Sequence, residues 1–138
     1  MATDIWIHLE YKSRKTKKYK YAGEFNVLRN YDMFSLLAGV THYHKPLYTP
    51  RGLPGGVCEC IYKEYKESVL NFHTPSWLST IEYRECLDAA DEIEKRECKQ
   101  DGREYDPTWL ESYNLIYDYM RTFDEVGDYA RIVFWFHT

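Results

Sequence analysis

Hydrophobic and polar residues alternate strictly near the N-terminus, over residues 4–11. One set is apolar, with Ile5, Ile7, Leu9 and Tyr11, and the other set is mixed, with Asp4, Trp6, His8 and Glu10. Successive side chains of a strand point to opposite faces of a sheet, so this segment is predicted to be a strand with one apolar face. After a basic stretch, the aromatic residues Tyr19, Tyr21 and Phe25 mark a second strand. The two strands are expected to form a hairpin with its cationic tip in water.

The C-terminal residues 130–136 carry a different pattern, because apolar residues occupy both alternating sets. The run reads Ala-Arg-Ile-Val-Phe-Trp-Phe. A strand that is apolar on both faces belongs in the interior of a sheet, where both of its sides are covered. This segment is therefore predicted to be an interior strand.

Two helices are predicted in the first half of the chain. A short buried helix is expected over residues 33–38, because Asp32 can accept the free N–H groups of its first turn and Gly39 can end it in a left-handed conformation. Residues 41–57 are rich in Pro, Gly, His and Tyr and are expected to form a long ordered loop. A second helix is predicted over residues 58–70.

The second half of the chain is predicted to be mainly helical before the final strand. Residues 71–78 interrupt the helical pattern and lead into a third helix, which begins at Ser79 because Ser79 and Glu82 have the spacing of a capping box. A fourth helix is expected after Asp106-Pro107, since a capping residue followed by proline is typical of a helix start. An amphipathic stripe then continues to Phe123.

Together these elements predict a single α+β domain over residues 1–138, with a small, mainly antiparallel sheet of about three strands packed on one face by three to four helices. The content of 44% hydrophobic and 29% charged residues is typical of a globular protein. The longest apolar runs are too short to cross a bilayer, and the N-terminal residues lack the pattern of a signal peptide. We therefore expect a cytoplasmic protein with no membrane association. Its four cysteines, Cys58, Cys60, Cys86 and Cys98, are expected to be reduced.

Charge is distributed unevenly along the chain. The net charge of −4 argues against broad nucleic-acid binding. Six cations nevertheless lie close together at the tip of the predicted hairpin: Lys12, Arg14, Lys15, Lys17, Lys18 and Lys20. The chain also contains 14 tyrosines, a residue that suits recognition surfaces as well as sheets and cores.

No established catalytic motif is present, since the chain lacks a phosphate-binding loop of the Walker type and the GxGxxG, HExxH and GxSxG patterns. Dispersed imidazoles and carboxylates could converge on the first strand as a divalent-metal site, with Asp4, His8, Asp32, His73 and His137 as candidates. A zinc site from His42, His44 and Cys58 or Cys60 would lack an evident fourth ligand. We therefore predict no catalytic residue, no metal ligand and no cofactor.

Isolated arginines beside aromatic or glycine-rich segments favour a binding function. Arginine presents a planar fork that fits a phosphate group bidentately, and aromatic side chains can stack on a base. The arginines are Arg29, Arg51, Arg121 and Arg131, and the aromatic candidates are Tyr31, Tyr43, Tyr48, Trp77 and Trp135. The combination suits a small nucleotide or a similar anionic ligand, although the arginines could equally pair with local acids and the aromatic residues could fill the core.

Four sequence blocks resemble a group of small proteins found largely in bacteriophages and prophages. These blocks are residues 29–34 (RNYDMF), 51–54 (RGLP), 73–78 (HTPSWL) and 131–136 (RIVFWF). The group carries RNYD, RGLP and HSxSWL blocks in the same order, and the likeness covers most of the chain outside residues 90–110. Thr74 stands where the group has serine, and His137 stands where it has aspartate. The resemblance implies a phage accessory protein and does not imply a reaction.

These observations lead to a first hypothesis of a non-enzymatic, phage-encoded counter-defence protein that captures a small signalling nucleotide in the host cytoplasm. In this hypothesis Arg29, Arg51 and Arg131 meet phosphates, Tyr31 and Trp77 stack on a base, and Asn30, His73 and Ser76 set specificity. One alternative is an inhibitor that binds a host enzyme through its tyrosine-rich surface or its basic hairpin. Another is a metal-dependent hydrolase that uses Asp4, His8, Asp32 and His73. A homodimer with a shared pocket is compatible with the first hypothesis.

Overall fold

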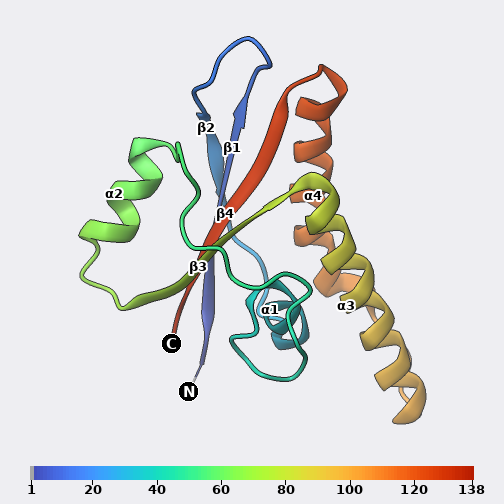
Figure 1. Ribbon diagram of the computed structural model, residues 1–138. Helices are drawn as coiled ribbons and strands as arrows, with labels where there is room; N and C mark the ends of the chain where they lie inside the picture. The colour runs from blue at the N-terminus through green and yellow to red at the C-terminus, as the bar shows by residue number, and fades with distance from the viewer. Residues whose placement is uncertain (1) are drawn as a thin grey trace.

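The computed structural model describes residues 2–138 and contains one four-stranded sheet. Its strands are β1 (Asp4–Lys12), β2 (Lys20–Phe25), β3 (Phe72–Ser79) and β4 (Tyr129–His137). They lie in the order β2-β1-β4-β3, and each neighbouring pair is antiparallel (Figure 1). The predicted α+β class, the N-terminal hairpin and the interior position of the last strand are confirmed. The sheet has one strand more than predicted.

Four helices surround the sheet: α1 (Tyr31–Ala38), α2 (Glu59–Glu67), α3 (Thr80–Gln100) and α4 (Leu110–Glu125). A 3-10 helix, η1 (Pro107–Trp109), precedes α4 and is capped by Asp106. The predicted capping box of Ser79 and Glu82 starts α3, and Gly39 ends α1 in the left-handed conformation. Asn30, and not Asp32, caps the N-terminus of α1, because the Asn30 side chain accepts a hydrogen bond from the Met33 N–H.

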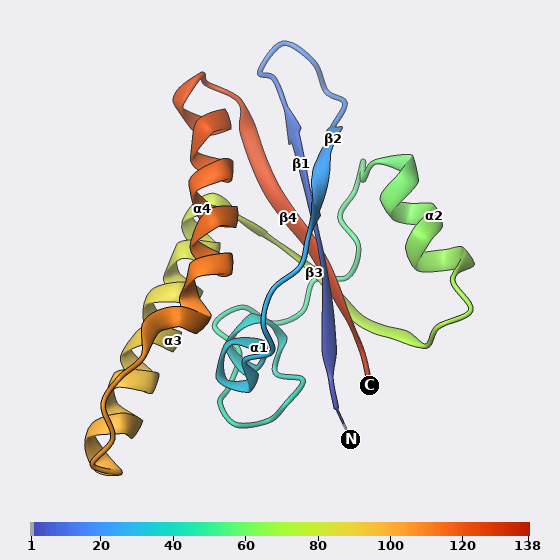
Figure 2. The ribbon, with the colours of Figure 1, turned by 180° about the vertical axis from the view of Figure 1, so that it is seen from behind.

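The helices cover both faces of the sheet, which corrects the prediction that they pack on one face. Helices α1, α3 and α4 lie against one face, and α2 lies alone against the other (Figures 1 and 2). None of the helices in residues 2–138 is long and apolar enough to cross a membrane. All four cysteines are free thiols.

Strand β3 is the element that the sequence pattern did not predict. Pro75 lacks a backbone N–H, and Thr74 has a positive φ of 55°, so the period-two pattern of a strand is broken at this point. The pairing with β4 shifts register between His73 and Ser76. Proline is tolerated in a sheet at an edge strand or a bulge, and β3 is both an edge strand and irregular.

The face covered by α1, α3 and α4, here called the helical face, holds the larger hydrophobic core. Alternate residues of β1 and β4, such as Ile7 and Phe134, are fully buried there against helix residues such as Phe34 and Ile116. The face covered by α2, here called the α2 face, has a smaller core around Ile61, Val133 and Trp135. The other set of residues from the same two strands lies on this α2 face, and it includes His8, Glu10 and Arg131.

Candidate functional site

A hollow of about 240 Å³ lies at the turn end of the β1–β2 hairpin, where the end of β1 meets the end of β3 and the start of β4. We call it the hairpin hollow. Its lining residues are Lys12, Tyr19, Trp77, Ser79, Tyr129, Ala130 and Arg131. Antiparallel pairing explains the convergence, because β4 pairs Tyr129 with Lys12 on one side and Arg131 with Ser79 on the other.

Arg131 forms a fixed wall of the hairpin hollow. Its side chain is buried, and its Nε donates a hydrogen bond to Glu10 Oε2 over 2.7 Å. Its Nη2 donates a second bond to the carbonyl oxygen of Gly55 over 3.0 Å. The guanidinium lies 3.5 Å from the centre of the Tyr19 ring. Because Glu10 balances its charge, Arg131 presents a flat, largely neutralised surface to the hollow.

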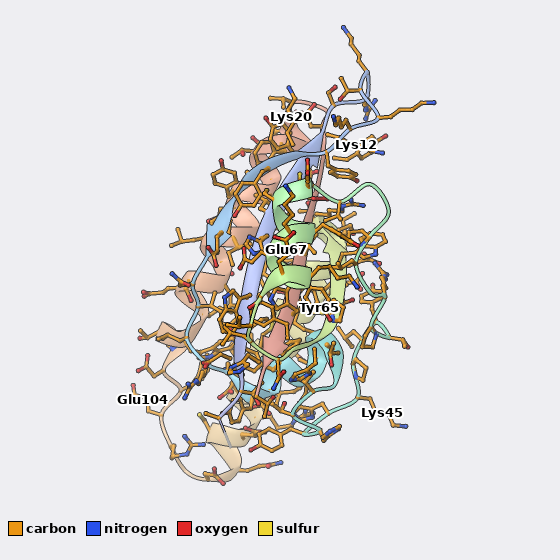
Figure 3. The ribbon with its side chains drawn as sticks, turned by 90° about the vertical axis from the view of Figure 1, so that its left-hand side faces the viewer. Lys12, Lys20, Lys45, Tyr65, Glu67 and Glu104 are labelled. Carbon is orange, nitrogen blue, oxygen red and sulfur yellow. The ribbon has the colours of Figure 1, made fainter. Side chains whose placement is uncertain are left out.

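Lys12 and Arg14 supply positive charge that is not balanced in the same way. Lys12 Nζ lies 5.1 Å from the centre of the Tyr19 ring and 5.8 Å from that of Tyr129. Arg14 lies 5.9 Å from the Tyr129 ring centre. Within residues 2–138 neither cation forms an ion pair. Arg14 and Lys15 also line a second hollow of about 490 Å³, which lies against the turn between α4 and β4. The hairpin end, with Lys12 and Lys20 labelled, extends beyond the rest of the sheet (Figure 3).

Arg51 holds Trp77 in place. Its Nη1 donates hydrogen bonds to the Trp77 carbonyl oxygen over 3.2 Å and to Glu82 Oε1 over 2.8 Å. The guanidinium lies 4.6 Å from the Trp77 ring centre. Ser76 Oγ accepts a hydrogen bond from the Arg51 N–H over 3.1 Å. The Arg51 hydrogen bond lowers the pKa of Glu82 to about 2. Arg51 and Ser76 therefore join the long loop to β3 and α3 behind the hollow.

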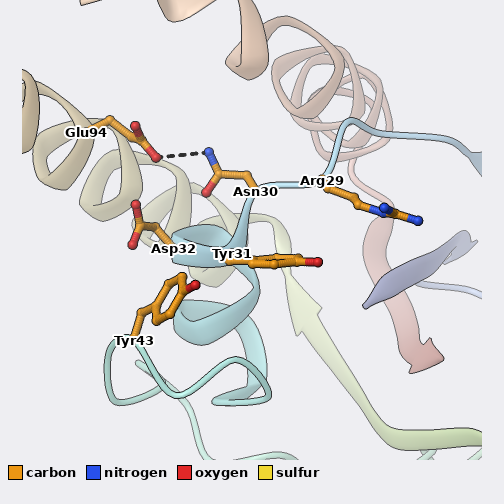
Figure 4. A pocket seen from close by; sticks show the side chains of 6 residues that line it. All are labelled: Arg29, Asn30, Tyr31, Asp32, Tyr43 and Glu94. Atoms are coloured by element: carbon orange, nitrogen blue, oxygen red, sulfur yellow. Dashed lines mark hydrogen bonds between the residues drawn. The ribbon is translucent and has the colours of Figure 1, made fainter. Parts of the chain in front are cut away.

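Arg29, Asn30 and Tyr31 lie elsewhere, in a second region at the N-terminus of α1. They line a hollow of about 300 Å³ together with Asp32, Tyr43 and Glu94, which we call the acidic hollow (Figure 4). Arg29 donates two hydrogen bonds to the Asp4 carboxylate, over 2.6 and 3.1 Å, and this contact lowers the pKa of Asp4. The Asn30 side chain donates to Glu94 Oε1 over 3.2 Å. Tyr31 Oη accepts a bond from the Thr3 N–H over 3.1 Å.

Two carboxylates, Asp32 and Glu94, line the acidic hollow, and His44 and Glu97 lie close to Asp32. Asp32 Oδ1 lies 2.8 Å from His44 Nε2, and potential metal-ligand atoms of Asp32, His44 and Glu97 lie within 4.8 Å of one another. Burial and the hydrogen bond to Asp32 raise the pKa of Glu94 to about 7, and burial also raises the pKa of Glu97. These neighbouring carboxylates favour the binding of a cation over that of a phosphate group.

His73 is separate from both hollows. Its Nδ1 contacts Thr74 Oγ1 and its Nε2 contacts Thr138 Oγ1, each over 2.9 Å. The ligand sets considered from the sequence are not brought together as whole sets, although Asp4 and His137 are paired across β1 and β4. Asp32 belongs to α1 on the helical face, whereas His8 lies on the α2 face. His44 contacts Asp32, whereas Cys58 is buried in the core of the α2 face.

Sequence reasoning did not single out several residues that define these two regions. Lys12 was noted only as part of the cationic tip and Tyr19 only as a residue of the second strand, and Tyr129 was not considered. In the acidic hollow, Glu94 and Glu97 lie three residues apart on α3, a spacing that places both on one side of a helix. That spacing was the available signal for the acidic hollow. For the hairpin hollow the signal is the strand register, which a single sequence does not give.

No family model matches the chain, and neither a curated protein sequence nor a solved structure matches it.

Proposed function

We propose that this protein binds a small nucleotide in the hairpin hollow and, as a phage accessory protein in the host cytoplasm, withdraws that nucleotide from antiviral signalling. The observation that carries the proposal is the position of Lys12. Its ammonium group lies over the Tyr19 and Tyr129 rings at the rim of the hollow, and it forms no ion pair within residues 2–138.

The hollow offers the two kinds of contact that a nucleotide requires. The half-exposed Tyr129 ring provides stacking surface for a base, a contact worth about 1 to 3 kcal/mol per base. Arg131 and Arg51 each lie over one face of Tyr19 and Trp77, so these two rings can stack only on a face that the arginines leave uncovered. Lys12 and Arg14 provide positive charge for phosphates. The charged residues that line the hollow, Lys12 and Arg131, are both cations, although the whole chain has a net charge of −4. These features support the nucleotide as the ligand class.

The lining of the hairpin hollow supports capture of the ligand and not its conversion. None of its seven residues is a cysteine, histidine, aspartate or glutamate, and its serine, Ser79, caps α3 by accepting a hydrogen bond from the Glu82 N–H, with no histidine or carboxylate of the lining beside it to act as a base. The nearby Cys58 is buried, and burial raises the pKa of its thiol to about 12. The thiol is therefore protonated and a poor nucleophile at neutral pH.

The counter-defence role is supported by the likeness of the RNYD, RGLP and HTPSWL blocks to small phage proteins. Two of the eight residues that the sequence suggested for binding, Trp77 and Arg131, line the hairpin hollow. Arg51 and Ser76 support Trp77 from behind. In the proposed site Arg51 and Arg131 position aromatic rings, and Lys12 and Arg14 meet the phosphates.

The test is calorimetric titration of the protein with cyclic dinucleotides, ADP-ribose isomers and NAD, followed by chromatography of the recovered ligand. We expect one of these nucleotides to bind and to be recovered intact. Lys12→Gln should weaken its binding at least about tenfold, the equivalent of about 1.4 kcal/mol. Lys45→Gln is the matched control, because Lys45 is exposed at the opposite end of the molecule (Figure 3).

Three outcomes would overturn the proposal. The first is no binding across the panel, which would direct attention to a host protein as the partner. The second is binding that Lys12→Gln and Lys45→Gln reduce equally, which would place the ligand elsewhere. The third is recovery of a chemically altered nucleotide, which would make the protein an enzyme.

A further inference from the structure

The α2 face buries three side chains that can carry charge, and only two of them balance each other. Glu10 and Arg131 form an ion pair in which Nη2 and Oε2 are 2.6 Å apart. His8, the third, is 1% exposed and packs against the Trp135 ring with 5.1 Å between ring centres. A buried polar group without a good partner is costly, so its surroundings indicate what it is there to contact.

The two nitrogens of His8 differ in their contacts. Nδ1 lies 2.9 Å from Tyr21 Oη in a good hydrogen-bond geometry. Nε2 makes no hydrogen bond to any atom of residues 2–138. Glu64 Oε2 lies only 3.1 Å from Nε2, so the two atoms face each other at close range without the alignment of a hydrogen bond. An N–H group at this position would be left unsatisfied, whereas a lone pair would be free to bind a cation.

Two carboxylates approach the His8 imidazole from different elements. Glu64 belongs to α2 and follows the fully buried Ile61 by three residues, so it lies on the side of the helix that faces the sheet. Glu24 belongs to β2 and lies directly opposite His8 in the register of β1 and β2. One potential ligand atom from each of His8, Glu24 and Glu64 lies within 4.8 Å of the others.

The spacing matches a shared metal ion. Two ligands that each bind a metal at about 2.1 Å lie about 3.0 to 3.4 Å apart when they occupy neighbouring coordination positions. The distance of 3.1 Å between His8 Nε2 and Glu64 Oε2 falls in this range. The Tyr21 hydroxyl at Nδ1 corresponds to the outer hydrogen bond that fixes the ring of a metal-bound histidine.

The protonation states of His8 and Glu64 are also compatible with a shared metal ion. Burial lowers the pKa of His8, so its imidazole is neutral at pH 7 and has a lone pair available. Partial burial also raises the pKa of the Glu64 carboxylate. A divalent ion would satisfy both groups at once.

We propose that His8, Glu24 and Glu64 form a binding site for a divalent transition-metal ion of the zinc class, with Tyr21 positioning His8. One imidazole and two carboxylates suit such ions. Three protein ligands leave a coordination position for water, as in metal sites that are open to solvent. The site shares no residue with the hairpin hollow, so it stands whether or not that hollow binds a nucleotide. It retains His8 from the ligands considered in the sequence and replaces the others.

The experiment is calorimetric titration with Zn²⁺ of the full chain carrying Cys60→Ser, which removes the exposed thiol as a competing ligand. Titration with Co²⁺ adds an absorption spectrum of the bound ion. We expect one ion at this site in each chain, seen as a change in the ¹⁵N chemical shift of His8 Nε2. Glu64→Gln and Glu24→Gln should each weaken binding more than tenfold, and Tyr21→Phe should weaken it about tenfold.

Glu67→Gln is the matched control, because Glu67 is exposed and lies on α2 one turn after Lys63 (Figure 3). It should leave the affinity unchanged. Glu64 is 36% exposed, so Glu64→Gln is expected to remain folded, and its circular dichroism spectrum checks this. Absence of Zn²⁺ binding overturns the proposal and leaves His8 and Glu64 as a polar pair without metal. Binding that Glu64→Gln and Glu67→Gln affect equally also overturns it.

Discussion

The two faces of the sheet are built from alternate residues of the same strands, yet they differ sharply in polarity. On the helical face, β1 and β4 bury apolar side chains such as Ile7 and Phe134. On the α2 face, the same two strands bury His8, Glu10 and Arg131. One helix covers this second face, whereas three helices cover the first (Figures 1 and 2).

This difference in polarity suggests that the helical face mainly stabilises the fold, whereas the α2 face carries the groups suited to binding. Apolar burial stabilises a fold by about 25 cal/mol for each Å² removed from water, so the helical face supplies most of the driving force. Buried polar groups contribute little net stability and are costly when they lack a partner. Their concentration on the α2 face, beside the hairpin hollow and around His8, is the pattern expected where binding takes precedence over stability.

The largest expected effect tests the helical face. Phe134→Ala removes a fully buried ring from the centre of the larger core, and it should lower the free energy of unfolding by about 3 to 5 kcal/mol. Urea denaturation followed by circular dichroism measures this change. Val133→Ala, the neighbouring position on the α2 face, should cost less because it removes fewer buried atoms. A loss from Phe134→Ala below about 2 kcal/mol would contradict its position in the larger core.

The next effect tests the charge balance of the α2 face. Glu10→Gln leaves the Arg131 guanidinium buried without its counter-charge, which should cost about 3 kcal/mol of unfolding free energy. The double variant Glu10→Leu/Arg131→Met removes both charges and should recover most of this loss. If the single variant costs less than about 1 kcal/mol, the pair is not the fixed wall described above.

The smallest expected effect concerns the acidic hollow at the rim of the helical face. The pKa of Glu94 is raised from 4.5 to about 7, so the folded state binds more protons than the unfolded state between these two values. By linkage, the stability contributed by protonated Glu94 is present below pH 4.5 and is lost as pH rises through about 7. Glu94→Gln should therefore be more stable than the native chain at pH 8, by about 1 kcal/mol after allowance for solvent screening.

Thermal denaturation of both proteins across this pH range measures the effect of Glu94→Gln. The difference between them should grow with pH and level off above neutrality. Glu92→Gln is a suitable control, since Glu92 is exposed on the same helix. A difference that does not depend on pH would contradict the raised pKa of Glu94.

Local patterns predicted much of the fold. The alternation in residues 4–11, the capping box at Ser79 and the left-handed Gly39 depend on neighbours in the sequence, and the structure confirms them. Strand β3 was missed because its proline and its bulge remove the alternation that marks a strand. The position of α2 on its own face was missed because an amphipathic pattern does not show which face of the sheet a helix covers.

The candidate sites were less accessible to sequence reasoning. Residues distant in the chain, such as Glu10 and Arg131 or His8 and Glu24, become neighbours only through strand register. Register is set by the pairing of whole strands in the sheet. A slip of one residue would move every side chain of a strand to the other face. Residue type alone suggested arginines as phosphate ligands, but Arg29, Arg51 and Arg131 are each held by an acid. Lys12 was the less conspicuous cation, and its charge is unbalanced within the described chain.

The bulge in β3 also bears on how copies of this protein could join. Pro75 offers no N–H along the outer edge of the sheet, and its carbonyl oxygen already accepts a hydrogen bond from the Gly52 N–H over 2.9 Å. An incoming strand would find this edge without a free ladder of donors and acceptors, a feature that protects sheets from edge-to-edge aggregation. A continuous sheet across two copies would have to form through β2, at the opposite edge beside the cationic hairpin tip, where like charges repel.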